Sequence, residues 1–198
     1  MNETIKDGGW VEVITGPMFS GKTEELLRRL RRATIAQQKV QLFKPAVDTR
    51  SETVRSHDAR EMPVVLVEYA FDIERIVQGA RFIDNDDVIG IDEAQFFAGQ
   101  EALGDIVSVV AQLARSRRVV VAGLDLDSSG QPFGLMPQLM AQADYVTKLL
   151  AVCTGCGNPA SRSQRITGSV PTGRVDIGGA DKYEACCRHC FQPSGVSP

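Results

Sequence analysis

Residues 10–23 read Trp-Val-Glu-Val-Ile-Thr-Gly-Pro-Met-Phe-Ser-Gly-Lys-Thr. The first six are rich in β-branched residues and predict a strand, which Gly16 ends with a turn. From Gly21 onward the apolar residues recur at the spacing of a helix. The segment between strand and helix matches the pattern G-x-x-x-x-G-K-[ST] in the structural context that this pattern requires. These residues therefore predict a nucleotide-binding phosphate loop at 16–23.

The loop pattern also predicts what its residues do. The two glycines let the backbone curl so that successive N–H groups point at phosphate oxygens, and the following helix adds the positive end of its dipole. Lys22 is expected to reach the β- and γ-phosphates, and the Thr23 hydroxyl is expected to bind Mg²⁺. The predicted phosphate-binding residues are Gly16, Pro17, Met18, Phe19, Ser20, Gly21, Lys22 and Thr23.

Two acidic residues follow a second buried strand. Val88-Ile-Gly-Ile91 is apolar throughout and runs into Asp92 and Glu93. Because ligands gather at the carboxyl ends of parallel strands, we expect both carboxylates beside the phosphate loop. Asp92 can hold Mg²⁺ through water opposite Thr23, and its alternative role is that of a helix N-cap. Glu93 can act as a base on a hydroxyl group or a water. The acceptor stays open at this stage: water, protein or a small molecule. The predicted ATP site continues through Ala94 and Gln95.

Apolar runs alternate with helical patterns along most of the chain. Further strands are predicted at 39–44, 64–67, 118–124 and 145–152, and helices at 71–79 and 102–114. This alternation predicts an α/β fold with a parallel sheet covered by helices on both faces. After Val152 the periodicity stops and Cys, Gly, Ser, Arg and Pro dominate. We therefore expect a flexible N-terminus at 1–9, a nucleotide-binding domain at 10–152, a small domain at 153–191 and a flexible tail at 192–198.

All five cysteines follow Val152, which argues against a disulfide framework and for a metal site. Cys153-Thr-Gly-Cys156 and Cys187-Arg-His-Cys190 are two C-x-x-C pairs, separated by residues 157–186. Four thiolates at this spacing can surround Zn²⁺ tetrahedrally, and a closed site of this kind folds a segment without taking part in chemistry. Redox-active or unliganded cysteines are the alternative. Cys186 or His189 can also replace a neighbour as ligand, although only Cys187 with Cys190 keeps the x-x gap.

Composition narrows the class of protein. The chain has 198 residues, 43% of them hydrophobic, and a formal net charge of −3, which excludes an intrinsically disordered chain. The mild acidity argues against a nucleic-acid partner, and no apolar run approaches the ~18 residues of a membrane span. Residues 1–9 are polar and do not resemble a signal peptide, so a cytoplasmic enzyme is expected. A cluster of arginines favours a solvated helix face or an oligomer contact over nucleic acid: Arg28, Arg29, Arg31 and Arg32.

With these motifs in order, the chain resembles thymidine kinases of the type II family, which are cytosolic and contain zinc. The resemblance extends from Trp10 to Phe191. It rests on the loop at 16–23, Val47-Asp-Thr-Arg50, Ser56-His-Asp58, Ile89-Gly-Ile-Asp-Glu-Ala-Gln-Phe-Phe97, Gly123-Leu-Asp125, Pro132-Phe-Gly134, Ile177-Gly-Gly-Ala-Asp-Lys-Tyr183 and the two cysteine pairs. It implies a RecA-like fold with a zinc-bearing lasso domain. It also implies transfer of the ATP γ-phosphoryl group to the 5′-hydroxyl of thymidine, and of deoxyuridine, giving dTMP in nucleotide salvage.

The resemblance also implies roles for individual residues. Glu93 matches the base that takes the 5′-hydroxyl proton, Lys22 the phosphate cradle, and Arg50 an arginine beside the transferred phosphate. The matching magnesium environment consists of Thr23, Asp92 and Asp48. The matching nucleoside pocket consists of Met18, Phe96, Leu124 and Tyr183, together with a lasso loop of Arg174, Val175, Asp176, Ile177 and Gly178 that binds the base through backbone groups. Family members are usually homotetramers that are inhibited by dTTP.

Two pocket positions depart from the family pattern. Ser128 stands where the family often has Phe, and Ser163 stands where Thr is common. The loss of an aromatic wall removes contact area, which lowers nucleoside affinity or widens the acceptor range, whereas the hydroxyl of Ser163 keeps the capacity to hydrogen-bond. The reaction type is unaffected.

Two other functions fit the residues alone. A nucleic-acid-stimulated ATPase with a zinc ribbon would need a basic face around the cysteines, and the net charge of −3 argues against it. A phosphate-loop regulatory switch would bind nucleotide with negligible turnover.

Overall fold

The structure is a computed structural model that describes residues 8–48, 53–55, 61–79, 88–97, 105–166 and 178–193. Its strands are β1 (Trp10–Thr15), β2 (Val40–Pro45), β3 (Thr53–Arg55), β4 (Glu61–Val67), β5 (Val88–Ile91), β6 (Arg118–Gly123), β7 (Tyr145–Lys148), β8 (Ala151–Val152), β9 (Pro159–Ala160), β10 (Arg162–Arg165) and β11 (Tyr183–Cys186). Its helices are α1 (Lys22–Ile35), α2 (Ala70–Gly79), α3 (Ile106–Leu113), α4 (Met136–Gln142) and the short 3₁₀ helix η1 (Ala94–Phe97).

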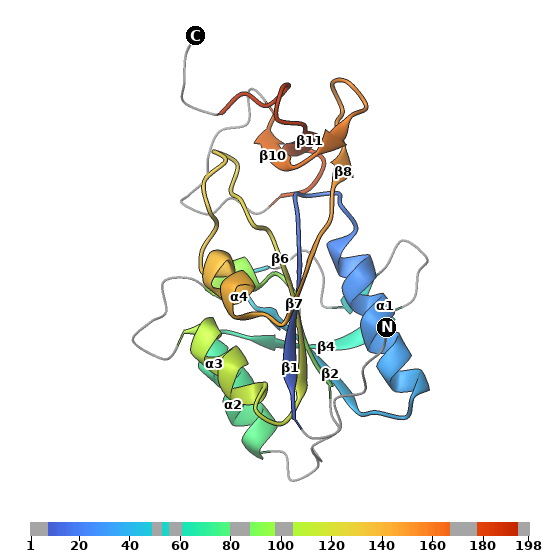
Figure 1. The fold of residues 1–198 in the computed structure, drawn as a ribbon, viewed down its shortest axis with the longest axis vertical. Coiled ribbons are helices and arrows are strands. Elements are labelled where there is room, and N and C mark those ends of the chain that lie inside the picture. Colours follow the sequence, from blue (N-terminus) through green and yellow to red (C-terminus); the bar gives the residue numbers. More distant parts are fainter. Residues whose placement is uncertain are drawn as a thin grey trace.

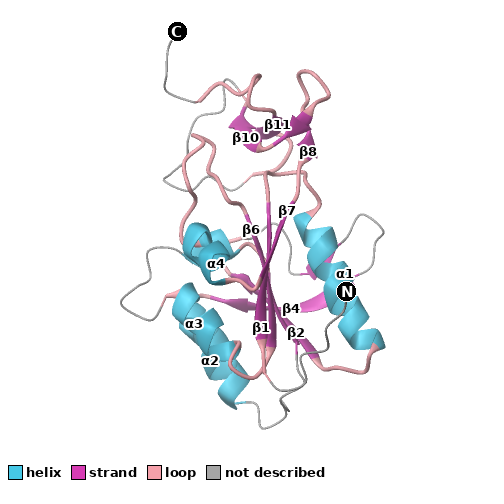
Figure 2. Cartoon of the chain, viewed as in Figure 1, coloured by secondary structure: helices cyan, strands magenta, loops and turns pink. Residues whose placement is uncertain are grey.

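The large sheet has the strand order β3-β4-β2-β5-β6-β1-β7. Strands β4, β2, β5, β6, β1 and β7 run parallel, and β3 pairs antiparallel with β4 at the edge. Figure 2 shows the helices on both sides of these strands. The predicted fold class, a parallel sheet covered by helices, is confirmed. Only β6 lies between β1 and β5, and all three strands run parallel. The two strands that carry the predicted site therefore end at the same edge of the sheet.

Each face of the sheet has its own apolar core, because side chains alternate between faces along a strand. On β6, Val120 and Ala122 pack toward α1, whereas Val119 and Val121 pack toward α2, α3 and α4. In Figure 1, α1 lies on one side of the sheet and these three helices lie on the other. Buried residues of α1 recur at helical spacing and anchor it: Leu26, Leu27, Leu30 and Ala33. The core thus fixes where α1 begins, directly after the phosphate loop.

A small C-terminal unit lies beyond the carboxyl ends of β1, β6 and β7 (Figure 1). It consists of two antiparallel pairs, β8 with β9 and β10 with β11. Its only apolar cluster among the described residues is formed by Ala151, Cys153, Ala160, Ala185 and Cys187, with Cys190 packed against it. Within the described ranges, no helix combines the length and apolarity that a bilayer span would need.

The structure corrects the single strand predicted at 145–152. Strand β7 ends at Lys148, and β8 belongs to the small unit. The Leu149 N–H still bonds to the Thr15 carbonyl at 2.8 Å, but the Leu150 side chain is half exposed where the chain leaves the sheet. The helix predicted at 102–114 begins at Ile106. The Asp105 carboxylate caps its N-terminus by accepting a hydrogen bond from the Ser108 N–H at 2.7 Å. Residues 98–104 lie outside the described ranges.

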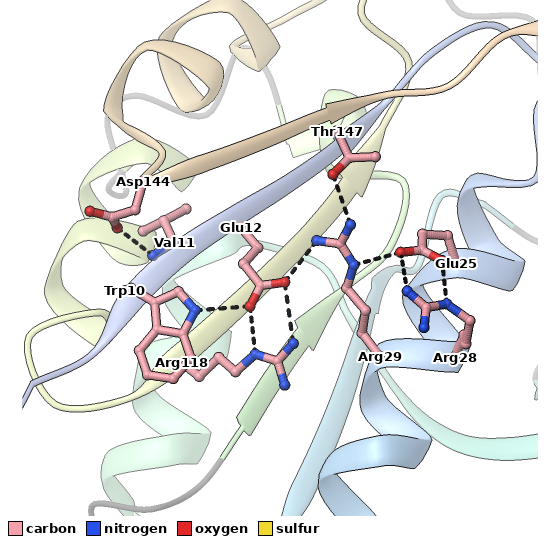
Figure 3. A network of polar contacts seen from close by, with 9 residues as sticks. All are labelled: Trp10, Val11, Glu12, Glu25, Arg28, Arg29, Arg118, Asp144 and Thr147. Carbon is pink, nitrogen blue, oxygen red and sulfur yellow. Dashed lines mark hydrogen bonds and ion pairs between the residues drawn. The ribbon is translucent and has the colours of Figure 1, made fainter. Parts of the chain in front are cut away.

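A buried polar network joins three strands to α1, as Figure 3 shows. The Glu12 carboxylate on β1 accepts from Trp10 Nε1 at 2.8 Å, Arg118 Nε at 2.6 Å and Arg29 Nη1 at 2.7 Å. Arg29 continues to Glu25 at 2.8 Å and to the Thr147 hydroxyl, also at 2.8 Å. The Arg29 side chain is therefore part of an internal network, whereas the sequence predicts a solvated helix face or an oligomer contact for the four arginines.

This network predicts how the stability of the fold depends on pH. Burial acts to raise the pKa of Glu12, but the hydrogen bonds from Arg118 and Trp10 outweigh it, so the net pKa lies below the ordinary 4.5. A lowered folded-state pKa contributes stability that is present above 4.5 and is lost as the pH falls below it. We expect Glu12→Gln to destabilise the fold by roughly 2–3 kcal/mol at pH 7, because charge-assisted hydrogen bonds are lost. Urea unfolding at pH 7 and pH 3 measures this; a difference that does not shrink at the lower pH contradicts it.

Candidate active site

The phosphate loop joins β1 to α1 through a strained backbone. Gly16 has a φ of 143°, and a Cβ there would lie 2.3 Å from the Leu149 carbonyl oxygen, so only glycine fits. Phe19 and Gly21 also have positive φ, at 64° and 80°. Gly21 precedes the first turn of α1, so the loop presents its backbone and the helix N-terminus to the same space.

Lys22 and Thr23 are held in place by hydrogen bonds within the site. Lys22 is buried, and its ammonium donates to the Pro17 carbonyl at 2.7 Å. The Thr23 hydroxyl donates to Asp92 Oδ2 at 3.2 Å. Asp92 directly follows β5, and its N–H bonds to the Phe43 carbonyl on β2 at 2.9 Å. The end of β5 thus brings the first acidic residue to the loop, as the sequence predicts.

The Asp92 carboxyl is suited to a divalent cation. Burial raises its pKa to about 7, and the neighbouring Glu93 charge adds to the effect. A buried carboxylate in this position is stabilised by a cation. Carboxylate and hydroxyl oxygens are also the ligand types that Mg²⁺ prefers. The pair of Thr23 and Asp92 therefore fits Mg²⁺.

Glu93 has a backbone conformation that is unusual for a residue other than glycine. Its φ is 53°, and its N–H donates to the Asp92 carboxylate at 3.0 Å. Left-handed backbone at a non-glycine residue costs of order 1–3 kcal/mol and concentrates at functional sites.

A cavity of about 630 Å³ lies between these elements. Its lining brings together the phosphate loop, Glu93, Leu124 at the end of β6, and Gly179 of the C-terminal unit. The loop residues that line it are Met18, Phe19, Ser20, Gly21, Lys22 and Thr23, with Glu24 beside them. Residues predicted for phosphate binding, for the base and for the nucleoside pocket thus face one space.

Other predicted residues are not among those that line this cavity. Asp48 is buried and forms an ion pair with Lys44 at 3.0 Å. Phe96 packs edge-to-face on Phe133, with ring centroids 5.8 Å apart. Ala94 is buried in the core, and the Asp92 carboxylate contacts the Thr23 hydroxyl.

The remaining pocket predictions fall in or near the C-terminal unit. The Ser163 hydroxyl accepts from the Met18 N–H at 2.9 Å, so β10 contacts the phosphate loop directly. Tyr183 is buried, and its ring lies 5.5 Å from the Arg165 guanidinium. Ser128 lies in the loop between β6 and α4, and Gly178 lies beside Gly179. Arg50, Arg174, Val175, Asp176 and Ile177 lie outside the described residues.

The four paired cysteines form a compact cluster. The sulfur atoms of Cys153, Cys156, Cys187 and Cys190 all lie within 4.8 Å of one another. Four thiolates at this separation match a tetrahedral zinc site. Neither Cys186 nor His189 joins the cluster that the described residues form, which resolves the alternative ligands left open by the sequence. Burial also raises the pKa of Cys186 to about 11, which keeps it a thiol.

Two supporting residues were not predicted. Lys44, which pairs with Asp48, is the one charged residue of strand β2 and stands near its end. A charged residue at the end of an apolar strand is the sequence feature that could have indicated its role. Phe133, which packs on Phe96, belongs to the Pro132-Phe-Gly134 string of the family resemblance, but it stands in a loop without periodicity that does not indicate which residue it contacts.

Comparisons with known proteins identify the family of this chain. A model of the family described as thymidine kinase matches residues 9–191. The chain belongs to the thymidine kinase family. A thymidine kinase from Rhodothermus sp. (strain ITI 518) is 54% identical over 188 residues, covering 93% of this chain and 82% of that protein.

One solved structure has a much weaker likeness. It is the genome packaging NTPase B204 from Sulfolobus turreted icosahedral virus 2 in complex with ATP-gammaS, with 15% sequence identity and a TM-score of 0.46. The alignment covers 71% of this thymidine kinase family member and 74% of that chain.

Proposed function

We propose that the chain transfers the γ-phosphoryl group of ATP to the 5′-hydroxyl of thymidine, giving dTMP, and that it also accepts deoxyuridine. Family membership supports thymidine as the substrate. The observation that carries the reaction is the cavity, in which the phosphate loop faces Glu93 and Leu124. A carboxylate opposite a phosphate cradle can take a proton from an acceptor hydroxyl as the phosphoryl group arrives.

The proposed mechanism gives each residue at the site a separate role. Loop N–H groups and Lys22 bind the β- and γ-phosphates, and Glu93 orients the 5′-hydroxyl and accepts its proton. Thr23, Asp92 and Asp48 would hold Mg²⁺, which would neutralise charge on the phosphates. We assign Arg50, which lies outside the described residues, to charge stabilisation at the transferred phosphate.

The proposed nucleoside pocket extends from the cavity toward the C-terminal unit. We assign thymidine contacts to Met18, Phe96, Leu124, Ser128, Ser163 and Tyr183, and to the lasso loop 174–178. Gly179 on the cavity lining and the Ser163–Met18 hydrogen bond of 2.9 Å support this direction. The absence of an aromatic side chain at Ser128 either lowers the affinity for the nucleoside or widens the range of acceptors.

We also propose a homotetramer, inhibited by dTTP and located in the cytoplasm. Support for self-association comes from β7, the edge strand of the described sheet, where Tyr145 and Val146 are about half exposed. Exposed apolar side chains on an open strand edge favour contact with another protein surface.

The test is the consumption of ATP in the presence of Mg²⁺ with and without thymidine. We expect turnover to depend on thymidine or deoxyuridine and to yield the 5′-monophosphate. Single-stranded DNA and RNA serve as controls and should not stimulate turnover. Equal rates with and without nucleoside would refute the proposal, and stimulation by nucleic acid alone would favour an ATPase.

A further inference from the structure

Gln95 lies in η1, two residues after Glu93, and its side chain makes two hydrogen bonds inside the protein. Its Nε2 donates to Glu93 Oε2 at 2.5 Å. Its Oε1 accepts from the Leu124 N–H at 3.0 Å. Only 1% of the residue is exposed to solvent. The amide therefore joins the candidate base to Leu124, and both of these residues line the cavity.

The orientation of this amide is determined by its neighbours. A backbone N–H can only donate, so the atom facing Leu124 must be the amide oxygen. The amide nitrogen then faces Glu93, where an ionised carboxylate can only accept. The charged acceptor makes this second bond a strong one.

The packing around the amide leaves little freedom. Gly123 ends β6 directly beside it, and a Cβ at that position would lie 2.7 Å from both Gln95 Oε1 and Met136 Sδ. The backbone of Glu93 is fixed as well, because the Asp92 carboxylate accepts its N–H at 3.0 Å. Glu93 is thus held at its backbone by Asp92 and at its carboxylate by Gln95.

We propose that Gln95 is a positioning residue, which orients the Glu93 carboxylate toward the acceptor hydroxyl and couples it to Leu124. This inference rests on the proposed function and replaces the ATP contact that the sequence motif suggested for Gln95. Misplacement of a reacting group by about 1 Å can cost roughly 10²-fold in rate. The contribution of Gln95 should therefore appear in the rate of phosphoryl transfer and not in substrate affinity.

Two substitutions separate the two hydrogen bonds. In Gln95→Glu the side chain keeps its shape and can still accept from Leu124, but it places a second carboxyl group against Glu93, so the two groups must share a proton and Glu93 loses its permanent N–H donor. In Gln95→Leu both bonds are lost. We expect each to lower the single-turnover rate of thymidine phosphorylation by roughly 10–100-fold, with KM for ATP and thymidine changed less than about threefold. Gln78→Leu, at an exposed glutamine of α2, is the matched control and should leave the rate unchanged.

A double-mutant cycle tests whether Gln95 acts through Glu93. In a Glu93→Gln background, adding Gln95→Leu should change the residual rate less than about twofold, because the carboxylate to be oriented is already gone. Leucine is used here because a carboxylate at position 95 could itself act as the base. If the leucine variant does not fold, as judged by thermal unfolding, Gln95→Met replaces it.

The outcomes separate the possible roles. Equal fold-losses in both backgrounds would mean that Gln95 acts independently of Glu93 and would overturn the inference. A raised KM for ATP at an unchanged rate would restore the ATP contact and overturn it too. Failure of the wild-type chain to phosphorylate any nucleoside is a separate result, because it refutes the proposed function before any variant is compared.

Discussion

Glu93→Gln is expected to lower the rate of phosphoryl transfer to thymidine by roughly 10²–10⁴-fold, which is the usual contribution of a general base. Glutamine has the shape of glutamate but cannot accept a proton at neutral pH. The substitution therefore removes the proposed chemistry while it keeps the side chain in the cavity. The single-turnover rate at saturating ATP and thymidine measures the effect without interference from product release.

The same variant should bind MgATP almost as well as the wild-type chain. In the proposed mechanism the phosphate loop and the Thr23–Asp92 pair bind the nucleotide and its Mg²⁺, and glutamine keeps the shape of the Glu93 side chain, so calorimetric titration with MgATP should give a similar Kd. Lys22→Met is the matched contrast, because it removes the cation proposed to bind the phosphates and should weaken ATP binding itself. Unchanged phosphoryl transfer in Glu93→Gln would remove Glu93 as the base.

Much of the fold could be predicted because its strands are apolar and end in recognisable turns. Trp10–Thr15 and Val88–Ile91 are found where the sequence places them. Helix α4, by contrast, is short and buries chiefly Met136 and Leu139, so its segment lacks the repeated spacing that identifies a helix. Its position depends on packing against the sheet, which local pattern does not contain.

The residues of the candidate site likewise differ in whether the sequence could predict them. Residues within a continuous motif, such as Lys22 and Thr23, were predictable because the loop, strand and helix stand next to one another in sequence. Contacts between distant segments were not: Ser163 bonds to Met18, which is 145 positions away. Likewise, the motif containing Gln95 indicates that the residue is near the nucleotide, but only the structure shows that its amide faces Glu93 and Leu124.

Removal of the metal is expected to abolish thymidine phosphorylation while the large sheet stays folded. The C-terminal unit has a very small apolar cluster, and two of its members, Cys153 and Cys187, belong to the four-cysteine group. Units of this size depend on a metal or on disulfides for stability. Structural zinc contributes on the order of 10–16 kcal/mol in small domains. Without the ion, the unit should lose its fold.

The consequences for the site follow from two contacts of that unit. Loss of its fold would release Ser163 from the phosphate loop and Gly179 from the cavity lining. We expect Cys153→Ser to weaken thymidine binding by roughly 10²-fold or more and MgATP binding by much less, since only the nucleoside pocket depends on the metal-bound unit for most of its residues. Calorimetric titrations and the zinc content of the purified protein measure both effects.

Cys186→Ala is the matched control, because Cys186 is buried in β11 but stands outside the four-cysteine cluster. It should retain both the zinc content and thymidine binding. Equal losses of thymidine and MgATP affinity in Cys153→Ser would indicate that the whole chain unfolds. A zinc-free variant that binds thymidine normally would show that the cavity is complete without the metal. A selective loss of thymidine binding, with the two large apolar cores intact, would instead show that the cysteine cluster acts on catalysis through the position of β10 and Gly179.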